Sequence, residues 1–286
     1  MSPMNNRLLV PRKTPGLLDL VPGAAAAYSL RSLSNSYAGP VVTVRRSSDD
    51  AEDSFTSAEV SDGTLAAFAG AGDAFVKTWH SQTGSNDATQ TTAGYQPKIV
   101  SSGVVILEEG KPALDFDGTD DYFDIATPTT LGIDSSSDPH TIVAVFKTDN
   151  ASGGEFIMSN YSGTAVNVLG FEADSIVNLR AGTASTNKAD AVQDTVQHIG
   201  VHLFSGGSAP RTFAGRRDGV PLPTTPADGV FTDSGSFESG QALRLGRWGT
   251  LSLYFNGKLQ EYIIWPSDLS PQVEQIEGQI AWSFSV

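Results

Sequence analysis

The sequence predicts an all-β protein, specifically a jelly-roll β-sandwich, on three observations. From residue 98 onward, short segments rich in β-branched and aromatic residues follow one another, and clusters of Gly, Asp, Asn, Pro or Ser separate most of them. No helical segment long enough to connect parallel strands lies between them, which argues against a βαβ fold. The 29 glycines and 15 prolines favour many turns over long helices.

Most of the chain is expected to consist of short strands, and the helices are expected to be few. The predicted strands are 41–44, 75–79, 98–100, 104–107, 113–116, 122–125, 141–147, 155–160, 166–171, 176–181, 198–204, 211–215, 242–248 and 259–265. The alanine-rich stretch 24–33 is predicted to be helical, as is 65–69, where Asp62 and Thr64 are suitable capping residues. A closing helix is predicted over 270–282, because Val273, Ile276 and Ile280 recur at helical spacing after Ser270 and Pro271.

Charge and composition exclude several classes of protein. The net charge of −14, from 18 basic and 32 acidic residues, disfavours binding to nucleic acid because the surface repels phosphates. The absence of cysteine excludes disulfides and cysteine-based metal sites. No apolar run reaches the roughly 20 residues of a membrane span, and the first residues do not resemble a secretory signal.

The first 27 residues are predicted to form an extended arm, because residues 1–22 contain four prolines and no regular period. Two interpretations stay open. The arm could be a loose terminus, as is common. Alternatively, it could dock on a partner protein through apolar side chains, for which the candidates are Leu8, Leu9, Val10, Leu17 and Leu18.

Residues 98–286 carry a family resemblance. KPALDFDGTDDYFDI (111–125), TIVAVFKTD (141–149) and the closing stretch YFNGKLQEYIIWPSDLSPQVEQIEGQIAWSF (254–284) resemble, in this order, the core strands and final helix of the LamG-like jelly-roll superfamily. The resemblance implies a concanavalin A/laminin G-like sandwich over 28–286. Residues 28–97 are then a front module and 98–286 the LamG-like core.

The front module carries a second resemblance. AYSLRSLSNSYAGPVVTVRRSSDDAEDSF (27–55) and FVKTWHSQTGSNDATQ (75–90) resemble a module of tailed-phage structural proteins, and are distantly similar to the catalytic domain of family-54 α-L-arabinofuranosidases. The phage resemblance implies a virion structural protein, tail- or fibre-associated or decorating the capsid. Its partners would be other virion proteins and host surface polysaccharide, with a homo-oligomer, such as a trimer, by analogy. A carbohydrate-binding adhesin module is the alternative.

The arabinofuranosidase resemblance implies two carboxylates about 5 to 5.5 Å apart for a retaining glycosidase. It places the acid just before the final strand, where LRLGRWGTLSLYFNG (243–257) contains no Asp or Glu, and only Glu172 stands near the expected nucleophile. That family is also disulfide-bonded, whereas this chain has no cysteine. On these grounds the sequence predicts that the chain is not an enzyme, and a glycoside hydrolase acting on arabinosyl side chains is kept as a further, less favoured alternative.

The remaining candidate residues are for binding. Asp115, Asp117, Asp120 and Asp121 form the densest carboxylate cluster, and Asp117, Asp120 and Asp121 are candidate ligands for calcium, the only cofactor that the sequence suggests. The alternative is turn chemistry, because Asp117-Gly118 suits a turn. Trp248 and Arg247 are candidates for glycan binding, while Trp265 and Trp282 are expected in the core. His198 and His202 are expected to be surface or edge residues.

Overall fold

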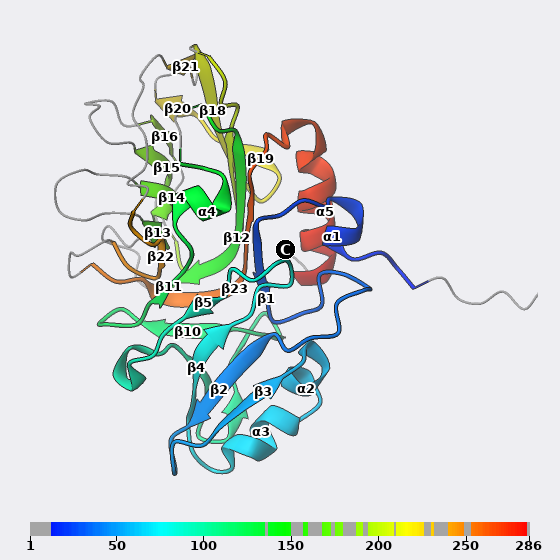
Figure 1. Ribbon diagram of the computed structural model, residues 1–286, viewed down its shortest axis with the longest axis vertical. Helices are drawn as coiled ribbons and strands as arrows, with labels where there is room; N and C mark the ends of the chain where they lie inside the picture. Colours follow the sequence, from blue (N-terminus) through cyan, green and yellow to red (C-terminus); the bar gives the residue numbers. More distant parts are fainter. Residues whose placement is uncertain are drawn as a thin grey trace, which may run out of the picture.

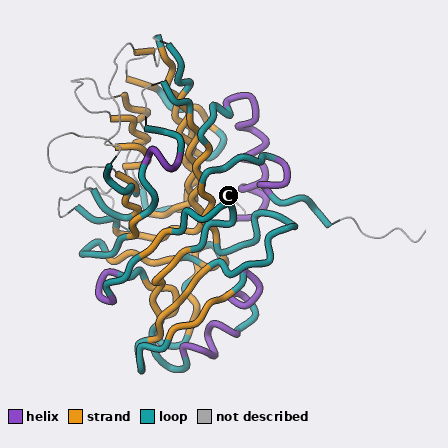
Figure 2. The backbone as a smooth tube through the Cα atoms, viewed as in Figure 1, coloured by secondary structure: helices purple, strands orange, loops and turns teal. Residues whose placement is uncertain are grey.

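The protein was analysed as a computed structural model, which describes residues 13–134, 137–149, 157–159, 168–172, 175–179, 187–190, 194–208, 210–225, 230–231, 240–248 and 253–284. Most of the described elements are strands, in agreement with the predicted fold class, and the helices lie at the periphery of the sheets (Figure 2). The helices are α1 (Leu17–Leu20), α2 (Ser57–Ser61), α3 (Thr64–Ala69), α4 (Pro128–Leu131) and α5 (Val273–Phe284), with 3-10 turns η1 (Ala93–Tyr95) and η2 (Ser270–Gln272). None of the described helices is long and apolar enough to cross a bilayer.

One large antiparallel sheet connects most of the strands. Its strands are β1 (Ala26–Ser29), β2 (Val42–Arg46), β3 (Glu52–Phe55), β4 (Ala74–Trp79), β5 (Ala88–Thr89), β6 (Lys98–Ser101), β7 (Val104–Val105), β10 (Leu114–Asp117), β11 (Phe123–Asp124), β12 (His140–Thr148), β13 (Met158–Ser159), β17 (Gln197–Phe204), β18 (Arg211–Arg217), β19 (Val220–Pro221), β21 (Val230–Phe231), β22 (Arg244–Leu245) and β23 (Asn256–Trp265). Two smaller sheets contain β14 (Val168–Glu172), β15 (Ser175–Leu179), β16 (Asn187–Asp190) and β20 (Thr224–Thr225), and β8 (Leu107–Glu108) and β9 (Lys111–Pro112).

Strand β23 organises the large sheet because it pairs with three strands. Along one edge it pairs with β12, and along the other it pairs first with β10 and then with β1. From β12 the sheet continues through β17 to β18, and from β10 it continues through β6 and β4 to β2 and β3. The β-branched and aromatic run of β23 suits this central position, since Leu259 and every later residue of the strand are buried.

The two faces of the β12–β23 region are covered by different layers. Helix α5 lies against one face, and the sheet β14–β15–β16 lies on the other side (Figure 1). The helical spacing of Val273, Ile276 and Ile280 is confirmed, because all three are buried in the core cluster that also contains Trp265. The structure is therefore a β-sandwich with one helix on its outer face.

The predicted front module and core are joined in one sheet. Strand β4 of the front part pairs with β6, and β1 begins at Ala26, two residues before the expected boundary. The alanine-rich stretch 24–33 was predicted to be helical, and this prediction is wrong. Ala26 and Ala27 pair with β23 and are fully buried, because burial against a partner strand outweighs the intrinsic helix preference of alanine.

The second half of the expected arm is part of this fold. Leu17 is fully buried in the core cluster beneath α5, and Leu18 packs against the same cluster. The Trp265 indole N–H donates a hydrogen bond to the carbonyl oxygen of Val21 (3.1 Å). The Leu17 side chain is therefore used within the chain itself, whereas Leu8, Leu9 and Val10 lie outside the described residues.

Substituting Leu17 tests whether this segment is integral to the fold. Leu17→Ala is expected to lower the free energy of unfolding by about 2 to 5 kcal/mol, because the substitution leaves a cavity in a packed core. Leu18→Ala, at a partly exposed neighbouring position, is the control and should cost less than half as much. Urea denaturation of both variants checks this, and equal losses would contradict it.

The histidines of β17 are buried, so the expectation of surface histidines is wrong. His202 is fully buried, and the side chain of His198 is 9% exposed. His198 lies between two carboxylates, with Nδ1 2.6 Å from Asp218 and Nε2 2.8 Å from Asp194. Burial alone would lower the pKa of His198, but the bonds to Asp218 and Asp194 outweigh it and raise the pKa above its ordinary value.

This arrangement predicts a pH-dependent contribution to stability. A histidine whose pKa is raised by folding contributes fully below its unfolded pKa of about 6.5, and the contribution is lost as pH rises through the folded pKa. His198→Gln should therefore cost more stability at pH 5.5 than at pH 9. Urea denaturation of both proteins at the two pH values measures the difference, and a loss that grows with pH would refute the prediction.

Candidate functional site

The acidic loop (residues 117–121) follows β10 directly. Gly118 allows the chain to turn there, with φ of 72°, and its N–H donates to the carbonyl oxygen of Phe255 (3.1 Å). Oδ1 of Asp117 accepts hydrogen bonds from the N–H groups of Thr119 (2.8 Å) and Asp120 (3.3 Å). The predicted turn chemistry is present, but β10 and β11 do not pair with each other. β10 pairs with β23 and β6, and β11 with β22 and β5.

Asp121 is the buried member of the loop, only 6% exposed. Its Oδ2 accepts a hydrogen bond from the N–H of Asp117 (3.1 Å). Burial, followed by the negative charge of Asp117, raises the pKa of Asp121 to about 7. Burial also raises the pKa of Asp115, although Lys258 at 3.7 Å opposes this shift. A carboxyl whose pKa is raised to about 7 therefore lies beside the carboxyl of Asp117.

These carboxyls line the acidic pocket, a depression of about 500 Å³. Its walls come from β2, β4, β6 and β10 and from the turn η1. The side chains that line it are Arg45, Phe75, Gln96, Lys98, Asp115, Asp117 and Asp121. The pocket thus combines acids, cations, an amide and an aromatic ring.

The cationic wall of the acidic pocket is held rigidly. The Arg45 guanidinium donates to Oε1 of Gln96 (2.9 Å) and pairs with Asp50 (2.7 Å). It lies over the Phe75 ring at 5.1 Å, and the Lys98 ammonium lies 5.6 Å from the same ring. The pocket therefore presents fixed donors opposite the carboxyls.

The glycan-binding candidates lie near the acidic loop in space. Arg247 lies over the rings of Tyr122 and Tyr254, at 5.1 Å from each centroid. Tyr122 immediately follows Asp121, and its ring is 5.9 Å from that of Tyr95. Trp248 is partly buried, and its backbone N–H donates to the carbonyl oxygen of Leu253 (2.9 Å). A group of tyrosines under Arg247 therefore adjoins the acidic loop.

Gly246 and Phe255, from the stretch 243–257 that contains no carboxylate, lie directly against the acidic loop. Besides the Gly118–Phe255 hydrogen bond, Gly246 approaches so closely that a Cβ there would lie 2.6 Å from the Phe116 ring and 3.1 Å from the carbonyl oxygen of Asp121. The carboxyls of the acidic loop thus lie beside Gly246 and Phe255, although they come from another part of the sequence.

Asp117, Asp120 and Asp121 could together hold a cation. One carboxylate oxygen from each lies within 4.8 Å of the others, which suits the oxygen-rich shell that calcium prefers. Calcium binding stays a prediction. We expect a calcium titration followed by calorimetry to show saturable binding in the wild type that is at least tenfold weaker in Asp120→Asn, and a flat titration would exclude this site.

The other candidates separate into core and surface. Trp79 and Trp265 are fully buried, as expected for Trp265, but Trp282 is 76% exposed, so its predicted place in the core is wrong. Residue 282 follows the buried stripe of α5 by two positions, which turns it to the opposite side of the helix. Glu172 ends β14, and its side chain lies outside what the structure describes.

Sequence reasoning missed the residues that complete the pocket. Arg45, Gln96 and Lys98 are far from the acidic loop along the chain and reach it only because β2, β4, β6 and β10 are neighbours in the sheet. No local pattern marks them. Predicting these residues would require the order of the strands in the sheet, which cannot be inferred from the sequence of this chain alone.

Comparisons with known proteins add information on the fold alone. No family model matches the sequence, and no curated protein matches it. A solved GH54 α-L-arabinofuranosidase soaked with 4-nitrophenyl α-L-arabinofuranoside is similar in structure, with a TM-score of 0.61 and 13% identity over 90% of this chain. An arabinofuranosidase complexed with arabinofuranosyl-α-1,2-xylobiose is similar with a TM-score of 0.57 and 14% identity, also over 90%.

The chain spans 62% of the length of each of these two proteins. The likeness shows a shared β-sandwich fold. It contradicts the prediction of a bacteriophage virion structural protein, because the similar structures are glycoside hydrolases. The prediction that the chain is not an enzyme is contradicted by the same finding. The phage and LamG-like assignments have no support from the comparisons.

Proposed function

We propose that this chain is a glycoside hydrolase and that the acidic pocket is its reaction site. The observation that carries the proposal is a pair of carboxyls on the wall of this pocket of about 500 Å³. Asp121 is buried and Asp117 is exposed, and one carboxyl oxygen of Asp121 lies within 4.8 Å of one of Asp117. Glycoside hydrolysis needs one carboxyl to donate a proton to the leaving oxygen and a second, ionised one to act on the sugar carbon. The fold shared with α-L-arabinofuranosidases supports this class of reaction.

Asp121 is the proposed proton donor. Its Oδ2 is occupied by the Asp117 N–H, which leaves Oδ1 to carry the proton toward the glycosidic oxygen. Asp117 is the proposed nucleophile, because the backbone N–H groups of Thr119 and Asp120 hold its Oδ1 and leave Oδ2 to attack. Because the two oxygens lie within 4.8 Å of each other, well short of the roughly 6.5 to 9.5 Å of inverting enzymes, the proposal includes retention of configuration.

The pocket walls would bind the sugar. Gln96, Lys98 and Arg45 offer fixed polar groups to sugar hydroxyls, and Phe75 offers an aromatic face. Arg247 and its tyrosines would contact the next sugar unit at the rim, in keeping with the predicted role of Arg247 and Trp248 in glycan binding. Because these contacts persist through the reaction, Arg247→Ala should raise KM more than it lowers kcat.

The decisive experiment is a panel of 4-nitrophenyl glycosides, starting with the α-L-arabinofuranoside and including pyranosides of xylose, glucose and galactose. Release of 4-nitrophenol above the buffer rate from at least one glycoside, lost in Asp117→Asn, supports the proposal. If no glycoside is cleaved, but calorimetry shows saturable binding of an oligosaccharide, the pocket binds carbohydrate without hydrolysing it and the proposal fails.

A further inference from the structure

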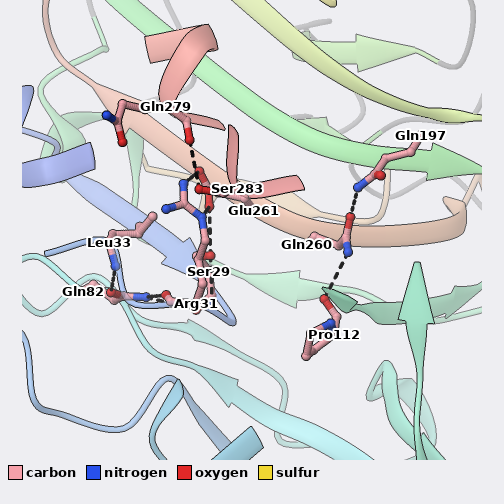
Figure 3. A network of polar contacts seen from close by, with 10 residues as sticks. All are labelled: Ser29, Arg31, Leu33, Gln82, Pro112, Gln197, Gln260, Glu261, Gln279 and Ser283. Carbon is pink, nitrogen blue, oxygen red and sulfur yellow. Dashed lines mark hydrogen bonds and ion pairs between the residues drawn. The ribbon is translucent and has the colours of Figure 1, made fainter. Parts of the chain in front are cut away.

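A second pocket, unrelated to the acidic pocket, lies where the N-terminal part of the chain meets α5. It has a volume of about 290 Å³, at the lower end of the range for small-molecule sites, and it shares no lining residue with the acidic pocket. Five separate segments contribute to it: residues 30–32, 57–61, 111–112, 260 and 283–284. Figure 3 draws four of its side chains, Arg31, Pro112, Gln260 and Ser283. We call it the junction pocket.

The junction pocket carries a positive charge in a strongly acidic protein. The Arg31 guanidinium forms a bidentate pair with Glu261, with Nε 2.9 Å from Oε2 and Nη2 3.0 Å from Oε1, so these two charges cancel (Figure 3). Lys111 is exposed at the pocket, and no ion pair to it occurs in the described part of the chain. Because Lys111 lacks an ion-pair partner among the described residues, its ammonium can pair with an anionic group of a ligand, and it locally opposes the net charge of −14 that repels anions elsewhere.

The floor of the junction pocket is pre-organised. Phe284 lies beneath the Arg31 guanidinium at 5.5 Å from its ring centroid, and Leu30 and Phe284 are each 3% exposed. The Gln260 amide donates to the carbonyl oxygens of Glu108 (3.0 Å) and Lys111 (3.1 Å). The Arg31 head and the pocket floor are therefore held before any ligand arrives, which lowers the entropic cost of binding.

Three serine hydroxyls of the wall are left as acceptors. Ser32 donates its proton to the carbonyl oxygen of Ser34 (2.8 Å), Ser61 to that of Ser57 (3.3 Å) and Ser283 to that of Gln279 (2.9 Å). A hydroxyl whose proton is used in this way still has lone pairs that accept. Such a wall is complementary to a ligand with several hydroxyl groups, and a purely hydrocarbon ligand would leave these acceptors unpaired.

We infer that the junction pocket binds a small polyhydroxylated carboxylate, of the size and chemistry of a hexuronic acid. Its carboxylate would pair with Lys111, with the remaining Arg31 N–H groups beside it. Its hydroxyls would donate to the three serine oxygens, and its less polar face would rest on Leu30 and Pro112. This site does not depend on the proposed hydrolase function, because none of its residues takes part in the acidic pocket.

Calorimetric titration of the full chain with D-glucuronate, D-glucose and octanoate tests the inference. Glucuronate should bind at least tenfold more tightly than glucose, which lacks the carboxylate, and than octanoate, which lacks the hydroxyls. Lys111→Met should weaken glucuronate binding at least tenfold. The matched control is Lys77→Met, which removes a lysine that pairs with Glu52 and lies outside the pocket, and it should bind like the wild type.

Three results would overturn the inference: no measurable binding of glucuronate, octanoate binding as tight as glucuronate binding, or equal affinities in the wild type and Lys111→Met. A failure of the hydrolase proposal is distinguishable from these results. Asp121→Asn changes the acidic pocket alone, so glucuronate binding should be the same in that variant as in the wild type.

Discussion

Asp121→Asn is expected to lower kcat for glycoside hydrolysis by at least about 100-fold, since a positioned general acid contributes roughly 10² to 10⁴ in rate. The amide keeps the shape of the side chain but cannot donate a proton to the leaving oxygen. Asp120→Asn is the matched control, because it makes the same substitution at the neighbouring residue, whose side chain does not line the pocket. The control should retain kcat within about threefold, and an equal loss in both variants would assign the effect to the acidic loop as a whole and not to proton donation by Asp121.

Two further measurements separate proton donation from a structural role of Asp121. Because its pKa is raised to about 7, the carboxyl is protonated below that value and ionises above it. The kcat/KM of the wild type, which reports groups of the free enzyme, should therefore fall as pH rises through about 7. The defect of Asp121→Asn should also be larger for an alkyl glycoside than for a 4-nitrophenyl glycoside, because 4-nitrophenolate leaves with little protonation. A defect independent of the leaving group would count against the proposed role.

Arg31→Met is expected to lower the free energy of unfolding by about 3 to 5 kcal/mol, the range for removing one partner of a buried ion pair. The Glu261 side chain is fully buried and, among the described residues, would keep only the hydrogen bond from the Ser29 hydroxyl (2.9 Å). Glu261→Gln should cost less than half as much, because the Arg31 side chain is 24% exposed and can hydrate its charge.

Urea denaturation at pH 7 measures both losses, and the asymmetry between them is the informative quantity. The double variant Arg31→Met with Glu261→Gln should be more stable than Arg31→Met alone, because it removes the stranded buried charge. A larger loss in Glu261→Gln than in Arg31→Met would contradict this prediction. It would mean that the hydrogen bonds accepted by the Glu261 carboxylate matter more for stability than the neutralisation of its buried charge by Arg31.

The fold could be predicted from the sequence where a strand or helix has its own pattern. The β-branched runs of β12 and β23 and the helical stripe of α5 are examples, and all three were expected within a few residues of their observed bounds. Strand β1 was not predicted, because Ala26 and Ala27 adopt strand structure only through pairing with β23. His198 was missed for the same reason, since its carboxylate partner Asp218 comes from the next hairpin.

One side of the candidate site, the acidic loop, could be predicted from the sequence, and the other side could not. The density of acids at residues 115–121 indicated a special loop, and its turn chemistry was anticipated at Asp117 and Gly118. Its depth and its opposite wall could not be predicted, because they depend on the order of β2, β4, β6 and β10 in the sheet. The stretch 243–257 contains no carboxylate, but its Gly246 lies beside the acidic loop, which does.

The pairing of β23 also sets the order in which the molecule can be completed during synthesis. β1, β10 and β12 each leave an edge open until residues 256–265 have emerged from the ribosome. Such long-range closure is slow, and open strand edges recruit other chains in the meantime. A nascent chain that stalls before residue 256 therefore leaves one edge of each of these three strands open to pairing with another chain.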